Sequence, residues 1–201
     1  MLLFPPTSRT SSLLFLLLAL LPIACDNDDD DNQDMPTDYS CIKLADENGQ
    51  SLGLYGCDAS SDWGSVALTP KEKALLDFES INTPPNNVAD SVSELVVFPN
   101  PVAVNGVLGM SLRGVTSGQN VLLKMVIVNS SGVPLMEGGL AVKTNSAVNQ
   151  SIPNIVFQTG QYYRIYYRVS TQTQPALLEG YGNFLVCKGP ISVGNIESDC
   201  M

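Results

Sequence analysis

The side chains best able to do chemistry stand in one acidic run, "CDNDDDDNQD", at residues 25–34. Asp26, Asp28 and Asp30 alternate like the first carboxylate ligands of an EF-hand calcium loop. That loop needs a glycine at its sixth position and a glutamate at its twelfth, where this chain has Asp31 and Thr37. The spacing therefore does not predict a specific calcium site, and we expect no bound metal.

Catalytic groups are equally hard to assemble from this sequence. The chain has no histidine, which removes His-based triads and most transition-metal sites. Residues 92–188 hold three acids, Glu94, Glu137 and Glu179, on different segments, so nothing suggests a carboxylate pair for glycoside hydrolysis. No glycine-rich phosphate loop follows a strand. We expect a protein that is not an enzyme, has no cofactor and binds no nucleic acid.

The N-terminal residues 1–24 are typical of a secretory signal peptide. They carry one charge, Arg9, followed by nine unbroken apolar residues from Leu13 to Leu21. A helix of that length rises only roughly 14 Å, about half of a bilayer core. We therefore expect export rather than a membrane span.

Small Ala24 directly before Cys25 resembles the lipobox of bacterial lipoproteins, in which the cysteine is lipidated and becomes the first residue. The resemblance implies a palmitate-bearing outer membrane lipoprotein, with Cys25 as the lipidation site and the membrane as a partner. Ordinary secretion with an unmodified Cys25 is the alternative. The acidic segment after it resembles those that direct some lipoproteins to the cell surface; a tether that only adds solubility is the other interpretation.

Four cysteines remain, and an even number in an exported chain favours two disulfides. Cys41 and Cys57 each lie eight residues from Gly49, and the stretch between them reads as a hairpin about an Asn-Gly turn. Of three connectivities, we predict Cys41 with Cys57 and Cys187 with Cys200. Zinc is the competing use, but there is no Cys-x-x-Cys spacing.

The exported chain divides by composition into four parts: an acidic disordered tether (25–39), a hairpin-plus-helix unit and linker (40–91), a β-rich module (92–188) and a C-terminal tail (189–201). Thr69, Pro70 and Glu72 form the signature of a helix N-terminus with a capping box. Ala74, Leu75 and Phe78 are its expected apolar stripe.

Within the β-rich module, short apolar runs alternate with Gly, Asn and Ser turns, which predicts a mainly β fold, an antiparallel β-sandwich. The predicted strands are 94–98, 107–113, 121–129, 134–143, 162–170 and 184–188. The run at 121–129 is almost continuously apolar, as expected for a central strand covered on both faces.

The strand "YYRIYYRVS" alternates strictly between two kinds of residue. Its odd positions are apolar or amphipathic, whereas its even positions are Tyr162, Arg164, Tyr166 and Arg168. If the even face meets water, it is a candidate binding patch, because Tyr and Arg are favoured at binding hot spots. The alternative is cross-strand stacking that only stabilises the sheet.

The motif Phe98, Pro99, Asn100, Pro101 resembles the opening of the type IX (Por) secretion system C-terminal sorting domain. Gly132 with Val133, the Gly160–Tyr162 step and the strand 184–188 follow in the order of that family. The resemblance covers residues 94–188 and implies an immunoglobulin-like β-sandwich of about seven strands that the secretion machinery reads as a transport signal.

Two features depart from that family: thirteen residues follow Lys188, and the chain resembles a lipoprotein. We therefore expect a lipid-anchored, non-catalytic envelope protein whose sandwich is a structural or binding module for a protein or glycan. The alternative is a secretion cargo in which residues 94–188 are the sorting signal. An enzyme is a third hypothesis, which would require activity to fall on substitution of Glu137 or Glu179.

Overall fold

The structure is a computed structural model that describes residues 38–58, 63–80, 82–86, 91–114, 116–189 and 196–200. The predicted signal peptide, the lipidation site Cys25 and most of the acidic tether lie outside these residues. Among the described residues, no helix has both the length and the apolar character needed to cross a membrane.

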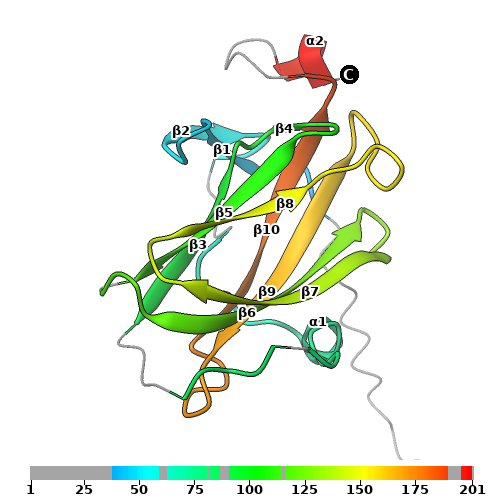
Figure 1. The fold of residues 1–201 in the computed structure, drawn as a ribbon. Helices are drawn as coiled ribbons and strands as arrows, with labels where there is room; N and C mark the ends of the chain where they lie inside the picture. Colours follow the sequence, from blue (N-terminus) through cyan, green and yellow to red (C-terminus); the bar gives the residue numbers. More distant parts are fainter. Residues whose placement is uncertain are drawn as a thin grey trace, which may run out of the picture. The chain divides into compact units, whose positions relative to one another are not determined.

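The described chain is mainly β and forms three sheets (Figure 1). A two-stranded hairpin contains β1 (Ile42–Ala45) and β2 (Ser51–Tyr55). A three-stranded sheet has the order β3 (Val92–Phe98), β5 (Val107–Gly114), β8 (Ala147–Ser151). A five-stranded sheet has the order β4 (Val102–Ala103), β10 (Leu178–Cys187), β9 (Tyr162–Ser170), β6 (Asn120–Asn129), β7 (Pro134–Lys143). All pairings are antiparallel except that of β4 with β10.

The three-stranded and five-stranded sheets bury side chains in one shared core. On β6, Leu123, Met125 and Ile127 point into this core, whereas Val126 and Val128 join a second cluster on the other face. The predicted central strand, covered on both faces, is confirmed. Residues 121–128 are apolar on both faces except for Lys124, because each face of the strand has a layer to pack against.

The second cluster covers the outer face of the five-stranded sheet with residues from the N-terminal part of the chain. Tyr39, Leu68 and Leu76 pack there against Val126 and Tyr166. Leu68 and Leu76 flank α1 (Pro70–Ala74), the short helix below the sheet in Figure 1. Residues on both sides of the predicted helix therefore pack on this sheet.

Helix α1 begins as the sequence predicts but ends earlier. The Thr69 hydroxyl accepts a hydrogen bond from the Glu72 N–H at 3.3 Å, and the Glu72 carboxylate accepts one from the Thr69 N–H at 2.7 Å. The capping box is thus confirmed. The helix ends at Ala74, which is exposed. Leu75 and Phe78 of the predicted stripe pack partly buried against the second cluster, and the fully buried apolar side chain is that of Leu76. Packing against the sheet replaces helix periodicity beyond the first turn.

Trp63 closes one side of the space between the two main sheets. Its backbone N–H donates to the Tyr181 carbonyl on β10 at 2.9 Å, and its backbone carbonyl accepts from the Leu95 N–H on β3 at 2.8 Å. Its side chain is buried in the main core, where it stacks on Tyr167 and lies flat against Gly182. A residue before the expected sandwich boundary thus belongs to the core.

The short β4 was not among the predicted strands, and β10 and β8 differ more widely from the sequence-based expectation. Strand β10 begins at Leu178, six residues before the predicted start, and β8 is absent from the predicted strands. Both segments are polar or rich in glycine, so they show little of the apolar alternation that marks a strand. Their pairing partners, β9 and β5, hold them extended.

Candidate functional site

The predicted exposed face of β9 is largely covered, and only Tyr162 and Arg168 at its two ends keep partial contact with water. Tyr166 is completely buried, and Arg164 is 1 % exposed. Tyr39 and helix α1 cover this face, and their position cannot be read from the strand's own alternation. The prediction of an exposed binding patch at Tyr162, Arg164, Tyr166 and Arg168 is therefore wrong, and the stacking alternative fits the structure.

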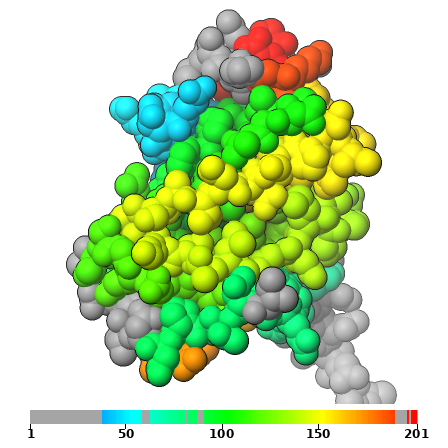
Figure 2. All heavy atoms as spheres, viewed as in Figure 1, coloured from blue at the N-terminus to red at the C-terminus, as the bar shows by residue number. Residues whose placement is uncertain are grey.

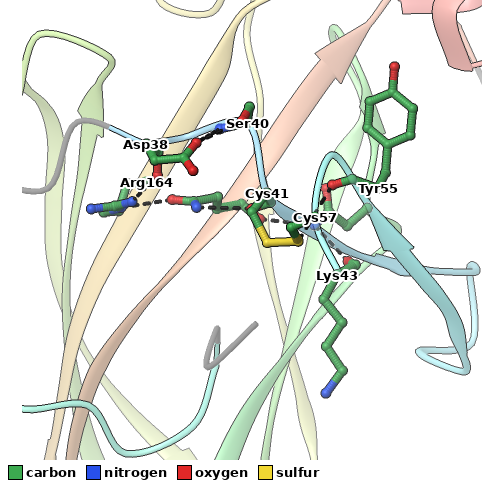
Figure 3. Close-up of a disulfide and its surroundings, with 9 residues drawn as sticks. Asp38, Ser40, Cys41, Lys43, Tyr55, Cys57 and Arg164 are labelled. Atoms are coloured by element: carbon green, nitrogen blue, oxygen red, sulfur yellow. Dashed lines mark hydrogen bonds between the residues drawn. A yellow bond between two sulfur atoms is a disulfide. The ribbon is translucent and has the colours of Figure 1, made fainter. Parts of the chain in front are cut away.

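The Arg164 side chain connects the N-terminal segment at Asp38 to the five-stranded sheet (Figure 3). Its Nε donates to the Asn183 side-chain oxygen at 2.7 Å, and its Nη2 donates to the Asp38 carbonyl at 2.6 Å. The guanidinium lies 4.3 Å from the ring centre of Tyr39 and 4.2 Å from that of Tyr181. These contacts compensate the loss of hydration of a buried charge, which is otherwise costly.

The other polar residues of this face also have structural roles. Burial raises the pKa of Tyr166, so its phenol stays neutral at physiological pH. Arg168 binds Glu179 at 3.1 Å and Asp77 at 3.2 Å, while Lys73 binds Glu179 at 2.8 Å. Burial acts to raise the pKa of Glu179, but hydrogen bonds and attraction from Lys73 and Arg168 outweigh it and lower the pKa. Tyr162 remains half-buried at the edge of a smaller cluster.

The motif Phe98–Pro101 ties the hairpin to both main sheets. The buried Asn100 amide donates to the carbonyls of Lys43 at 2.9 Å and Asn183 at 3.0 Å, and its side-chain oxygen accepts from the Leu185 N–H at 3.3 Å. Its backbone also exchanges two hydrogen bonds with Ala45 on β1. One asparagine therefore joins β1 and β10.

Phe98 makes the second connection. Its ring lies so close to Gly109 on β5 that a Cβ at that glycine would stand 2.7 Å from the ring. A Cβ at Gly49, the hairpin turn residue with φ of +75°, would stand 3.1 Å from the same ring. Both glycines leave room for the aromatic side chain, so the hairpin turn packs directly on the motif.

An open groove of about 600 Å³ lies between the hairpin and this motif. In Figure 2 the hairpin, in blue and cyan, stands out from the surface beside the green segment that holds β4 and the start of β5. The apolar side chains that line the groove include Leu44, Leu52, Pro99, Val102, Val107 and Ile196. Its charged side chains are Asp46 and Glu47, both acidic, at the hairpin turn.

Two disulfides cross-link the segments that border this groove. Cys41 pairs with Cys57 across the hairpin (Figure 3), and Cys187 pairs with Cys200. This is the predicted connectivity. The second bond attaches α2 (Ile196–Cys200) to the end of β10, which places Ile196 at the groove.

The groove is the site that sequence reasoning missed. The only hint in the sequence near the hairpin is two leucines, Leu52 and Leu54, next to an acidic turn. The structure shows that both are exposed. Its other wall comes from residues about 50 positions further along the chain. Among the described residues, no group of histidine, cysteine, aspartate and glutamate side chains could hold a metal ion.

The amino-acid sequence of this chain matches no protein-family model and no curated protein.

Proposed function

We propose that this protein is a lipid-anchored, non-catalytic component of a bacterial cell envelope that displays an immunoglobulin-like β-sandwich as a binding module. The observation that carries the proposal is the open groove at the Phe98–Pro101 motif. Its walls are apolar and its two acids lie on a turn, where Asp46 accepts hydrogen bonds from the N–H groups of Asn48 and Gln50. Such a lining suits recognition better than bond cleavage.

The arrangement of the two main sheets supports the sandwich. They share one core, and their strands are joined mostly by antiparallel pairing, as in immunoglobulin-like folds. One disulfide closes the hairpin and the other joins the end of β10 to α2, which suits a domain in an oxidising compartment.

The lipid anchor rests on the Ala24–Cys25 step after the apolar run. A palmitate analogue fed to cells should label the wild-type chain and not the Cys25→Ser variant. The double variant Cys41→Ser/Cys57→Ser is the matched control, because it removes two cysteines that form a disulfide and should keep the label. Label that persists on Cys25→Ser would show the anchor assignment to be wrong.

The position of the anchored protein has its own test. We propose that it resides in the outer membrane and is exposed at the cell surface, held away from the bilayer by mutual repulsion within the acidic tether. Protease treatment of intact cells should then cleave the chain, as it would cleave a known surface protein. Cleavage only after the outer membrane is opened would place it on the periplasmic side.

A secretion cargo is the second candidate, favoured by the structural importance of Asn100 within the sorting-like motif. Trp63 argues against a signal that works as a separate fragment, because it lies outside residues 94–188 and its side chain fills the core of the two main sheets. Removing such a side chain costs about 3 to 5 kcal/mol. A fragment of residues 92–188 is therefore expected to fold poorly.

Fusions to a reporter with its own signal peptide, in a host with the secretion system, separate the two candidates. The fragments are residues 38–201, 92–201 and 92–188. The binding-module proposal expects none to reach the medium. Release of the 38–201 fusion would favour the cargo function instead.

A further inference from the structure

The groove keeps large apolar side chains in contact with water. Leu52 is 40 % exposed and Val107 is 48 % exposed, and both line the groove. Leu54 on the same strand is 38 % exposed. Three of the five exposed large apolar residues in the described part of the chain thus lie at the groove or next to it. An apolar patch with a polar rim is the usual sign of an interaction surface.

The hairpin directs Leu52 toward the groove through an irregularity in its pairing. Leu44 stands opposite Gly53, but Ala45 stands opposite Ser51, so Leu52 has no partner of its own on β1. Such a bulge re-aims a side chain and twists the strand locally. The exposure of Leu52 thus follows from the strand pairing of the hairpin.

The charged side chains that line the groove are both negative. Asp46 and Glu47 are its only charged lining residues, and Glu47 is exposed, with no ion pair in the described part of the chain. The nearest lysine of the hairpin, Lys43, is already paired with Glu94. A ligand that carries positive charge is therefore favoured over a neutral or acidic one.

The groove also favours a peptide over a sugar. No Phe, Tyr or Trp side chain is among the lining residues that the structure describes, so these offer no flat ring on which a sugar could stack. Strand β2 borders it and pairs only with β1 among the described strands. Its second edge can therefore accept main-chain hydrogen bonds from an extended segment.

We propose that the groove binds an extended polypeptide segment that carries apolar side chains together with at least one lysine or arginine. The apolar side chains contact Leu52 and Val107, and the cation contacts Glu47. This inference rests on the proposed binding function and deepens it by giving the chemistry of the partner.

The test uses the full chain in detergent and three labelled, capped peptides, with binding followed by fluorescence anisotropy. One peptide alternates valine with lysine, one valine with glutamate, and one serine with lysine. The first should bind at least about tenfold more tightly than the other two, since it alone has both the apolar and the cationic groups.

Two groove variants and two matched controls then locate the binding. Val107→Asp should weaken the valine-lysine peptide about tenfold, and Glu47→Lys about fivefold. The controls Val133→Asp and Glu137→Lys make the same changes at exposed positions outside the groove and should bind as the wild type does. All four side chains are exposed, so equal thermal midpoints will show that each variant is folded.

Equal binding of the valine-lysine and valine-glutamate peptides overturns the proposal, as does an equal loss in variants and controls. Binding of an envelope oligosaccharide that Val107→Asp weakens, with no peptide binding, makes the occupant a glycan and the peptide proposal wrong. Palmitate labelling of Cys25 is read on the same samples. Labelled protein that binds no peptide contradicts the groove proposal alone, whereas unlabelled protein that binds it contradicts the anchor alone.

Discussion

Replacing Asn100 by alanine should destabilise the whole fold, although the residue lies in a loop between two strands. The change removes three side-chain hydrogen bonds and leaves the carbonyls of Lys43 and Asn183 and the N–H of Leu185 without this partner. A buried polar group left unsatisfied costs about 1 to 3 kcal/mol. Two of these three bonds are fully buried, so we expect a loss of about 3 to 5 kcal/mol.

A loss of this size is measurable by urea unfolding. A domain has a total stability of about 5 to 15 kcal/mol, and the free energy falls by about 1 to 3 kcal/mol per molar urea. The midpoint for Asn100→Ala should therefore fall by about 2 M. Asn48→Ala, at an exposed position of the hairpin turn, is the matched control and should change the free energy of unfolding by less than about 0.5 kcal/mol.

Asn100→Asp separates the hydrogen bonds from the volume of the side chain. It keeps the size and one acceptor oxygen but sets a carboxylate against two carbonyls, so at neutral pH it should be at least as damaging as alanine. Burial and these oxygens would raise the pKa of the new carboxyl in the folded state. The part of the penalty that comes from ionisation should be absent below the unfolded pKa of about 3.9 and grow as the pH rises above it. A loss for Asn100→Ala below about 1 kcal/mol, or equal to that of Asn48→Ala, would refute the assignment of Asn100 as the connection between hairpin and sheet.

Two further predictions concern the core and the ion pairs. Gly182→Ala would bring a Cβ against the buried Trp63 ring and should cost about 1 to 3 kcal/mol in thermal unfolding, whereas Gly138→Ala, with no atom within 4 Å of the new Cβ, should be nearly neutral; equal effects would contradict the packing. Because the folded-state pKa of Glu179 is lowered, its contribution to stability is present above pH 4.5, its ordinary value, and is lost as the pH falls below that value. Urea midpoints measured between pH 7 and pH 3 should therefore fall less steeply for Glu179→Gln than for the wild type. The control Glu137→Gln, at an exposed position, should follow the wild type, and parallel curves for all three proteins would refute the role of this ion pair.

Features that depend on neighbours in the sequence were predicted well. The Thr69 capping box involves residues three positions apart, and the Cys41–Cys57 pair follows from a hairpin whose turn lies midway between the two cysteines. The long apolar strand β6 was also recognisable, since its composition alone shows that both faces are covered. Each of these features is determined by local geometry, which a sequence pattern reports directly.

The environment of β9 and the groove was decided by contacts between distant segments. The alternation of "YYRIYYRVS" shows that the two faces of the strand differ, but Asp38 and Tyr39, more than 120 residues upstream, bury the polar face by packing on Arg164. The groove likewise exists only where the hairpin turn meets Phe98–Pro101 and α2. A sequence pattern records which side chains are apolar or charged. What covers them depends on chain segments brought together in the folded state, and that information is not local.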